Sequence, residues 1–226
     1  MANPGLRVKM SFTRPDPALV KKFAGVPVAN IGDNMNRISC MNARVRPMNA
    51  APLLGCAFTV KVRAGDNLLF HKAIDMAQPG DIIVIDAQNE QSYAIFGELM
   101  IMWLRRRGIT GVVVDGCIRD YDYIQKLEDL SVYATGITPN GPLKEGGGEI
   151  NFPVMCGGLV VNPGDIIVGD SDGIVVVNPA DAEDVLQKAQ TQNTKEAKAM
   201  QDIENLTWDR AWVDASLKAK GCEFIA

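Results

Sequence analysis

The sequence predicts a single α/β domain that ends in a helical extension. Between residues 44 and 177, runs of β-branched residues alternate with segments of helical periodicity, which is typical of strands and helices in one layered fold. Residues 180–226 are polar and helical in pattern. The chain has 226 residues, 47% of them hydrophobic, and no low-complexity linker, so one domain with a complete core is expected over 1–226.

Local signals predict the elements in order. Residues 1–14 show no periodic pattern and are expected to form a loose tail. Asp16 followed by Pro17 is an N-cap signal, so a short helix is expected up to Gly25. A second short helix is expected to begin near Asn30 and to carry Asp33. From residue 44 on, the predicted strands are 56–62, 81–85, 111–115, 131–135 and 153–161, and the predicted helices are 65–77, 91–107 and 121–127.

A short motif, Pro-Gly-Asp-Ile-Ile-Val, occurs at 79–84 and again at 163–168. Each copy is a turn that leads into a buried strand. After the second copy, the stretch Asp-Ser-Asp-Gly at 170–173 is a hairpin turn signal before a strand at 174–177. The repetition is local and does not indicate a duplicated domain.

Charge and cysteine content narrow the functional classes. Lys and Arg total 23 against 27 Asp and Glu, and the net charge of −4 argues against a nucleic-acid partner. No apolar run approaches the roughly 20 residues that cross a bilayer, and no signal-peptide pattern opens the chain. The five cysteines are odd in number and widely spaced, which indicates reduced thiols. We therefore expect a cytoplasmic protein without membrane or nucleic-acid partners.

The single histidine, His71, limits the possible chemistry. Sites that need several histidines are excluded, and His71 itself is expected at a helix–sheet contact. Catalysis would therefore depend on carboxylates, Arg, Lys and backbone amides.

Glu98 and the Arg119-Asp120 pair form the most informative pattern. About nine helical residues after Glu98 run roughly 14 Å in one direction, and the strand 111–115 returns roughly 16 Å. Because these lengths nearly cancel, Glu98, Arg119 and Asp120 are expected together beyond the carboxyl end of the strand. On spacing alone, a surface ion pair of Arg119 with Asp120 beside a solvated Glu98 is the simpler interpretation.

The same three residues also suit catalysis. Two carboxylates, Glu98 and Asp120, offer hard oxygen ligands for Mg²⁺ or Mn²⁺, directly or through water. Arg119 can bind a substrate carboxylate or enolate. If a helix begins near Gly97, the free amides of Leu99 and Met100 form an anion site. Together these groups suit stabilisation of a pyruvate enolate.

The segment GELM…GVVVDGCIRD, with GDNLLFHKAI before it and FPVMCGGLVVNPGDIIVGDSDGIVVV after it, resembles the RraA-like family. The similarity runs from about Asp16 to the C-terminus and is greatest to the 4-hydroxy-4-methyl-2-oxoglutarate / 4-carboxy-4-hydroxy-2-oxoadipate aldolases. This resemblance implies a swivelling β/β/α domain and a class II pyruvate aldolase dependent on Mg²⁺ or Mn²⁺. Its substrate would be a small 2-oxo acid, and decarboxylation of oxaloacetate would follow from the same pyruvate enolate.

The resemblance also implies roles for single residues. An acidic residue, twenty intervening residues and an Arg-Asp pair mark the metal-dependent aldolases, although Asp is usual where this chain has Glu98. Asp120 would bind the metal directly and Glu98 would bind it through water. The substrate would be held by Gly97, Glu98, Leu99, Met100, Arg119 and Lys144. Family members assemble as homotrimers or homohexamers with sites between subunits, so Asp33 and Glu196, which match carboxylates near the site, are expected to serve a neighbouring chain.

Other functions are weaker. A non-catalytic RraA-type regulator that binds RNase E is the alternative, but such a protein has no physical need for an acid at Glu98 opposite Arg119-Asp120. A methyltransferase is disfavoured because no glycine-rich strand–loop–helix is followed by an acid that would bind ribose. Lys144 lies in a glycine-rich loop, which favours an ionic contact over a Schiff base.

Overall fold

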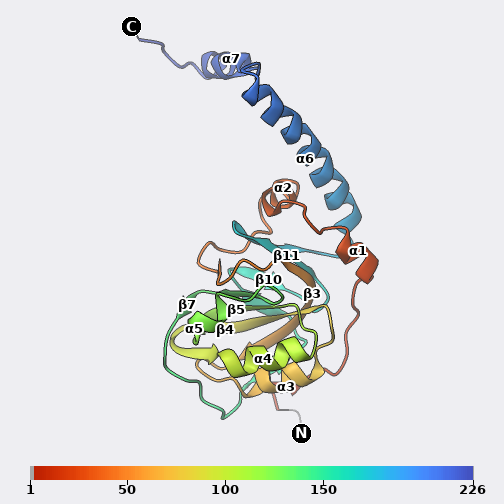
Figure 1. Cartoon of the computed structure of the whole chain (residues 1–226), viewed down its shortest axis with the longest axis vertical. Helices are drawn as coiled ribbons and strands as arrows, with labels where there is room; N and C mark the ends of the chain where they lie inside the picture. Colours follow the sequence, from red (N-terminus) through yellow and green to blue (C-terminus); the bar gives the residue numbers. More distant parts are fainter. Residues whose placement is uncertain (1–2, 226) are drawn as a thin grey trace.

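The computed structural model describes residues 3–225 (Figure 1). In this part of the chain, a ten-stranded sheet forms the centre, with strand order β1-β8-β3-β4-β5-β6-β2. Its middle is parallel and consists of β3 (Leu53–Val62), β4 (Asp81–Phe96), β5 (Gly111–Ile118) and β6 (Ser131–Ala134). Beside them lie the short strands β1 (Leu6–Val8), β8 (Gly148–Ile150) and β2 (Arg46–Pro47). The carboxyl ends of the parallel strands therefore share one edge, where α/β sheets bind ligands.

Additional strands pair with the ends of two of these parallel strands. The hairpin of β11 (Ile166–Asp170) and β12 (Gly173–Val177) pairs through β11 with the first residues of β3. Strand β7 (Gly136–Ile137) pairs with the last residues of β5. The predicted turn at 170–173 is confirmed, since Asp170 pairs with Gly173 at the closed end of the hairpin.

Helices and a small hairpin cover the two faces of the sheet. Helices α3 (Leu68–Met76), α4 (Glu98–Arg106) and α5 (Tyr121–Ile124) lie on one face and share its core cluster (Figure 1). The other face packs against the two-stranded sheet of β9 (Val154–Cys156) and β10 (Leu159–Val161). Helices α1 (Pro17–Lys21) and α2 (Val28–Asp33) form a third cluster with β11, β12 and the start of α6.

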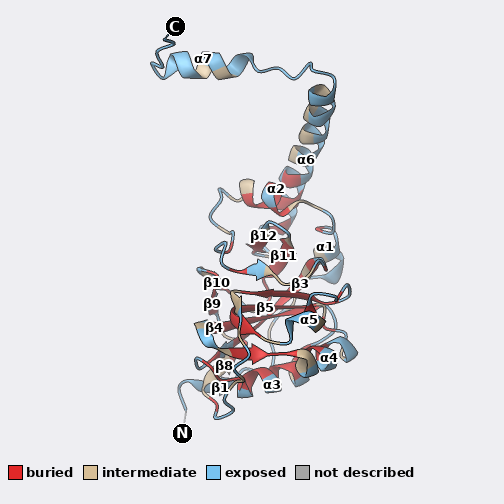
Figure 2. Ribbon diagram, turned by 60° about the vertical axis from the view of Figure 1, so that its left-hand side comes forward, coloured by how far each residue is buried: buried red, intermediate tan, exposed pale blue. Residues whose placement is uncertain are grey.

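The C-terminal extension is helical, as predicted. Helix α6 (Ala182–Glu204) is buried only at its beginning, around Val185 and Leu186, and then leads away from the sheet. Helix α7 (Ala211–Ala219) lies at the far end and has no buried residue (Figure 2). None of the helices in residues 3–225 has the length and apolar character that a membrane span requires.

The predicted loose tail at 1–14 is wrong for the described part of that segment. Residues 6–8 form β1, which pairs in parallel with β8. Arg14 donates two hydrogen bonds, of 2.9 and 2.7 Å, to the buried carboxylate of Asp81. The segment is therefore held by contacts with residues far along the chain, which local periodicity does not reveal. Residues 1 and 2 of the predicted tail lie outside the described residues.

The predicted helix at 91–107 is also wrong in its first half. Strand β4 continues to Phe96, and α4 begins only at Glu98. The register between β4 and β5 shifts along this stretch, so that Glu90 pairs with Gly116, and Ala94 with Cys117. Gln88 and Asn89 make the excursion with φ values of 59° and 54°, in the left-handed region that Asn tolerates better than most residues. The helix is thereby shortened to the part that follows Gly97.

Candidate functional site

Two strand ends and two helix starts meet at the carboxyl edge of the sheet. Gly97 joins β4 to α4, and Arg119-Asp120 joins β5 to α5. The Arg119 amide donates to the Phe96 carbonyl at 3.0 Å, which continues the pairing of β4 with β5 into this edge. The structure therefore brings Glu98, Arg119 and Asp120 together, as the opposed lengths of helix and strand predict.

The Asp120 carboxylate faces the first turn of α4. Its Oδ2 accepts a hydrogen bond of 2.9 Å from the Glu98 amide, and the Arg119 Nε lies 3.7 Å from the same oxygen. A carboxylate at this position interacts favourably with the positive end of the helix dipole. Glu98 thus contacts Asp120 through its main chain, and a role for its carboxylate stays a prediction.

Asp120 has an unusual backbone conformation. Its φ of 58° and ψ of 41° lie in the left-handed region, which is uncommon for residues other than glycine. Its carbonyl accepts the amides of Tyr123 and Ile124, so the residue also begins α5. Such conformations persist where the surrounding structure enforces them, and they cluster at functional sites.

Gly97 leaves the space that the Asp120 carboxylate occupies. A Cβ on Gly97 would lie 2.1 Å from Asp120 Oδ2 and 2.9 Å from Arg119 Cγ. Its φ of −149° is ordinary extended backbone, so the requirement for glycine is one of space alone. The first-turn amides of Leu99 and Met100 follow directly, where a helix offers N–H groups without intrahelical partners.

The loop that carries Lys144 approaches the site from the side of α3. A Cβ on Gly141 would lie 3.0 Å from Arg119 Nη1, so the beginning of this loop touches the guanidinium group. Lys144 is exposed. Two effects lower the pKa of His71: partial desolvation, which is the larger, and the positive charge of Lys144. His71 is on the exposed side of α3, so the expected helix–sheet contact is wrong.

Asp33 and Glu196 lie elsewhere in the chain, next to each other. Gln192 on α6 donates to Glu196 Oε1 at 2.8 Å and to Asp33 Oδ2 at 3.3 Å. The buried Asn30 donates to Glu196 Oε2 at 2.8 Å. This cluster joins α2 to α6, away from α4 and α5 (Figure 1). The structure therefore does not bring Asp33 or Glu196 to Asp120 within one chain, and their service to a neighbouring chain stays a prediction.

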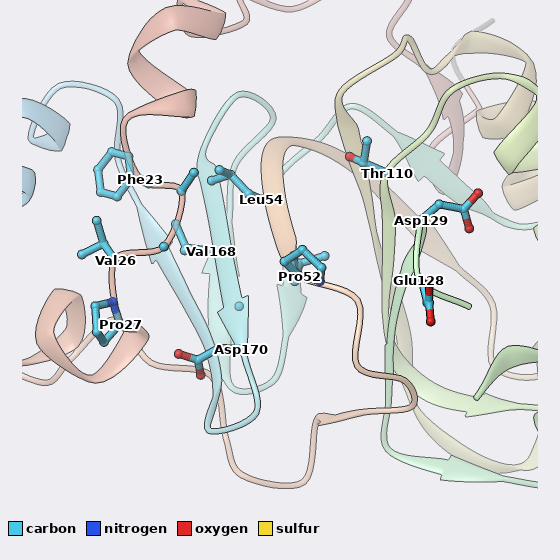
Figure 3. A pocket seen from close by; sticks show the side chains of 14 residues that line it. Phe23, Val26, Pro27, Pro52, Leu54, Thr110, Glu128, Asp129, Val168 and Asp170 are labelled. Atoms are coloured by element: carbon cyan, nitrogen blue, oxygen red, sulfur yellow. The ribbon is translucent and has the colours of Figure 1, made fainter. Parts of the chain in front are cut away.

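The site is open to solvent in the single chain. The side chains of Arg119 and Asp120 are 43% and 42% exposed. A pocket of about 650 Å³ lies at the other end of β5, where Thr110 precedes the strand (Figure 3). It is lined mainly by apolar groups such as Phe23 and Leu54, and eight strand residues, about 25 Å, separate its Thr110 from Arg119. The chemistry of Asp120 therefore does not coincide with this pocket.

Two buried residues of the site region were missed by the sequence prediction. Asn67 Nδ2 donates to the Ile95 carbonyl at 2.9 Å and to Met100 Sδ at 3.4 Å, which ties α3 to the first turn of α4. Asp66 accepts amides from α3 and from the Lys144 loop. The only local signal was an acidic residue in the first turn of the helix predicted over 65–77, which is ordinary there and gives no information on the loop.

Comparison with known proteins defines the family. The family model described as "RraA-like: Aldolase/RraA" matches residues 28–176. The chain belongs to the RraA-like family. This membership agrees with the predicted α/β fold, and the structure itself shows the predicted helical C-terminal extension in α6 and α7.

Individual RraA-like relatives match over most of the chain. A protein of Halalkalibacterium halodurans named "Putative 4-hydroxy-4-methyl-2-oxoglutarate aldolase" is 37% identical over 86% of this chain and 93% of its own length. An uncharacterized protein of Methanocaldococcus jannaschii is 34% identical over 77% of this chain and 88% of its own. Among solved structures, Streptomyces coelicolor RraAS2, described as an unusual member of the RNase ES inhibitor RraA protein family, superposes with a TM-score of 0.73. It is 26% identical and covers 83% of this chain and 99% of its own.

Proposed function

We propose that this chain is a divalent-metal-dependent pyruvate aldolase, a lyase. It would cleave 4-hydroxy-4-methyl-2-oxoglutarate or 4-carboxy-4-hydroxy-2-oxoadipate into pyruvate and a second 2-oxo acid, and it would decarboxylate oxaloacetate. The observation that carries the proposal is the meeting of the Asp120 carboxylate, the Arg119 guanidinium and the start of α4 at one edge of the sheet. The name of the H. halodurans relative supports the same reaction class.

The residues at this edge fit a hydrated divalent cation. Residues 3–225 contain no group of three or more His, Cys, Asp or Glu side chains placed to hold a metal ion. In the proposed site, Asp120 would be the one direct carboxylate ligand, and Glu98 would act through a bound water. Mg²⁺ and Mn²⁺ suit such a sparse oxygen site, because Mg²⁺ usually keeps several of its waters. Bound there, the ion would act as a Lewis acid on the pyruvyl oxygens.

The protein groups would stabilise the enolate. When the bond between C3 and C4 of the substrate breaks, its electron pair passes into the pyruvyl unit and forms an enolate. The amides of Leu99 and Met100 would bind the pyruvyl carboxylate at the start of α4. Arg119 would offset the charge that develops on the pyruvyl oxygen and would hold the water that relays the proton of the C4 hydroxyl. Lys144 would add a positive charge on the substrate side.

The open site supports an assembly in which a second copy covers it. We propose a homotrimer or a dimer of trimers with sites at the subunit boundaries. Exposed apolar side chains that such a contact would cover lie on α4, at Leu99 and Trp103, and in the extension, at Trp212 and Phe224. A neighbouring chain would also bring the cluster of Asp33 and Glu196 to the site. Partial recovery of activity on mixing inactive Asp120→Ala and Glu196→Ala subunits would support the shared site, and no recovery between two folded variants would count against it.

A second candidate function is that of a non-catalytic regulator that binds an RNase E-type enzyme. The similarity to Streptomyces coelicolor RraAS2 favours it. A purely binding protein has no physical need for an acid at Glu98 beside the Arg119-Asp120 pair. The aldolase is therefore the better supported function.

Pyruvate release tests the proposal. Purified protein stripped with EDTA should be inactive toward both hydroxy acids and toward oxaloacetate, and Mg²⁺ or Mn²⁺ should restore turnover. Asp120→Asn should remove activity without loss of thermal stability, because the side chain is half-exposed. Lys188→Ala, on the exposed surface of α6, is the matched control. Full turnover in EDTA, or by the Asp120→Asn variant, would refute the metal mechanism.

A further inference from the structure

A fully buried carboxylate lies between the end of β3 and the start of α3. Asp66 is 0% exposed. Its Oδ1 accepts the Leu68 amide at 2.9 Å, and its Oδ2 accepts the amides of Glu145 and Gly146 at 2.6 and 3.1 Å. An ionised group is tolerated in the interior only when hydrogen bonds or opposite charges satisfy it, and here three amides do so, with the Arg63 guanidinium 3.7 Å away.

The two oxygens of Asp66 serve different structures. Oδ1 accepts the Leu68 amide two residues on, which is the ordinary Asx turn of an acid just before a helix, since Asn67 is the N-cap of α3. Oδ2 accepts its amides from the loop that carries Lys144, 79 residues or more along the chain. That turn needs only one oxygen, so the hydrogen bonds to Oδ2 of Asp66 require another explanation.

Hydrogen bonds fix the main chain on both sides of Lys144. After it, the amides of Glu145 and Gly146 are held by Asp66. Before it, Leu143 donates to the Gly65 carbonyl at 2.8 Å and accepts the Asn67 amide at 3.0 Å. Three glycines at 146–148 follow, all with positive φ, and such a segment has much conformational freedom to lose. The Gly147 carbonyl accepts the Arg63 amide at 3.1 Å and β8 begins at Gly148, so the part of the loop that depends on the carboxylate is Glu145 and Gly146.

The beginning of the same loop lies at the reacting groups. The Asn140 carbonyl accepts the Ala94 amide at 2.8 Å, two residues before β4 ends. Gly141 touches the Arg119 guanidinium, because a Cβ added to this glycine would lie only 3.0 Å from Nη1. The loop therefore spans from Arg119 at one end to Asp66 at the other, with Lys144 between them.

We propose that Asp66 is a positioning residue that clamps the loop of residues 140–147 and thereby sets Lys144 beside the substrate. This inference rests on the proposed function, because Lys144 binds an anionic substrate group only if the site takes 2-oxo acids. The clamp itself is independent of any activity. Asp66 does not touch the substrate and acts through Lys144.

The clamp is tested without substrate by Asp66→Ser. A serine hydroxyl can still accept the Leu68 amide in a turn of the same kind but is too short to hold the loop. Hydrogen exchange at the amides of Glu145 and Gly146 should become roughly tenfold faster or more, since two hydrogen bonds to a charged group are lost. Glu145→Gln is the matched control, because it removes the exposed ion pair with Arg63 and keeps both amides on Asp66. Unchanged exchange in folded Asp66→Ser would overturn the clamp.

The single histidine reports where Lys144 lies. Because the charge of Lys144 helps to lower the pKa of His71, Lys144→Met should raise that pKa in an NMR titration. Asp66→Ser should raise it in the same direction if the loop moves away. The charge of Asp75, which raises this pKa, stays in both variants, and any loss of burial when the loop moves away would raise the pKa in the same direction. A His71 pKa that responds to Lys144→Met and not to Asp66→Ser would also contradict the clamp.

A double-mutant cycle separates positioning from general destabilisation. Asp66→Ser and Lys144→Met should each raise KM for the hydroxy-acid substrate about tenfold, and the double variant should be within about twofold of Lys144→Met alone. Independent effects that multiply would show that Asp66 does not act through Lys144. If the wild-type protein releases no pyruvate, the proposed function fails, while hydrogen exchange and the His71 titration still decide on the clamp.

Discussion

Replacement of Gly97 by alanine tests the geometry of the site with a single added methyl group. The Cβ would lie 2.1 Å from Asp120 Oδ2, whereas real Cβ atoms essentially never come closer than 3.0 Å to such neighbours. The Asp120 carboxylate must therefore move by about 0.9 Å or more, the difference between these two distances. The backbone at Gly97 is extended, so alanine fits the main chain and the whole effect falls on Asp120 and on Arg119 Cγ.

The expected effect on activity is much larger than that on stability. Misplacement of a catalytic group by about 1 Å can cost about 10²-fold in rate, so we expect a loss of this size in metal-dependent pyruvate release. Both displaced side chains are half-exposed and can shift into solvent. The free energy of unfolding should therefore fall by only about 1 kcal/mol, the lower end of the range for substitutions that overpack a site.

Steady-state pyruvate release and thermal unfolding of Gly97→Ala measure the two effects. Arg106→Ala, on the exposed last turn of the same helix, is the control and should match the wild type in both. A Gly97→Ala protein with near-normal turnover would show that the position of Asp120 is unimportant. A variant that is inactive only because it unfolds would equally refute the reasoning.

Three further predictions concern other contacts. Arg119→Lys keeps the positive charge but loses the planar guanidinium group with its paired N–H donors, so kcat should fall by about 10²- to 10³-fold at nearly unchanged stability. A near-normal kcat would show that Arg119 contributes only its charge. Arg44→Ala should lower the free energy of unfolding by about 2 kcal/mol in urea titrations, because it removes two hydrogen bonds to the buried Asp115 carboxylate; an unchanged urea midpoint would contradict this. In native protein, a thiol reagent at mildly alkaline pH should label only the exposed Cys40 and Cys222, because the other three thiols are buried. Labelling of all five cysteines would contradict the fold.

The position of the site could be predicted from the sequence because it depends on local lengths. The helix after Glu98 and the strand before Arg119 run in opposite directions over similar distances, and this geometry needs no knowledge of distant contacts. The chemistry at Glu98, Arg119 and Asp120 follows from residue type. The space at Gly97 could not be foreseen, because it depends on where the Asp120 side chain points.

The features that were missed depend on pairings between distant segments. The extension of β4 to Phe96 is stabilised by residues 116–118 of β5. Because the register shifts along this stretch, its apolar and polar residues do not alternate as they do in a regular strand, and the sequence does not predict the strand. The strand β1 exists because β8, far along the chain at 148–150, offers an edge. Asp66 falls in the first turn of the helix predicted over 65–77, where an acid is ordinary, and its contact with Glu145 and Gly146 appears only in three dimensions.

Manganese binding in the presence of oxalate, a stable analogue of the pyruvate enolate, tests the central claim most directly. Electron paramagnetic resonance of EDTA-stripped protein titrated with Mn²⁺ would count bound ions with and without oxalate. We predict one ion per chain, bound more tightly with oxalate, and binding weaker by about tenfold or more in Asp120→Asn. Saturable binding that is the same in wild type and Asp120→Asn, or that oxalate does not change, would contradict a metal-dependent enolate site at Asp120.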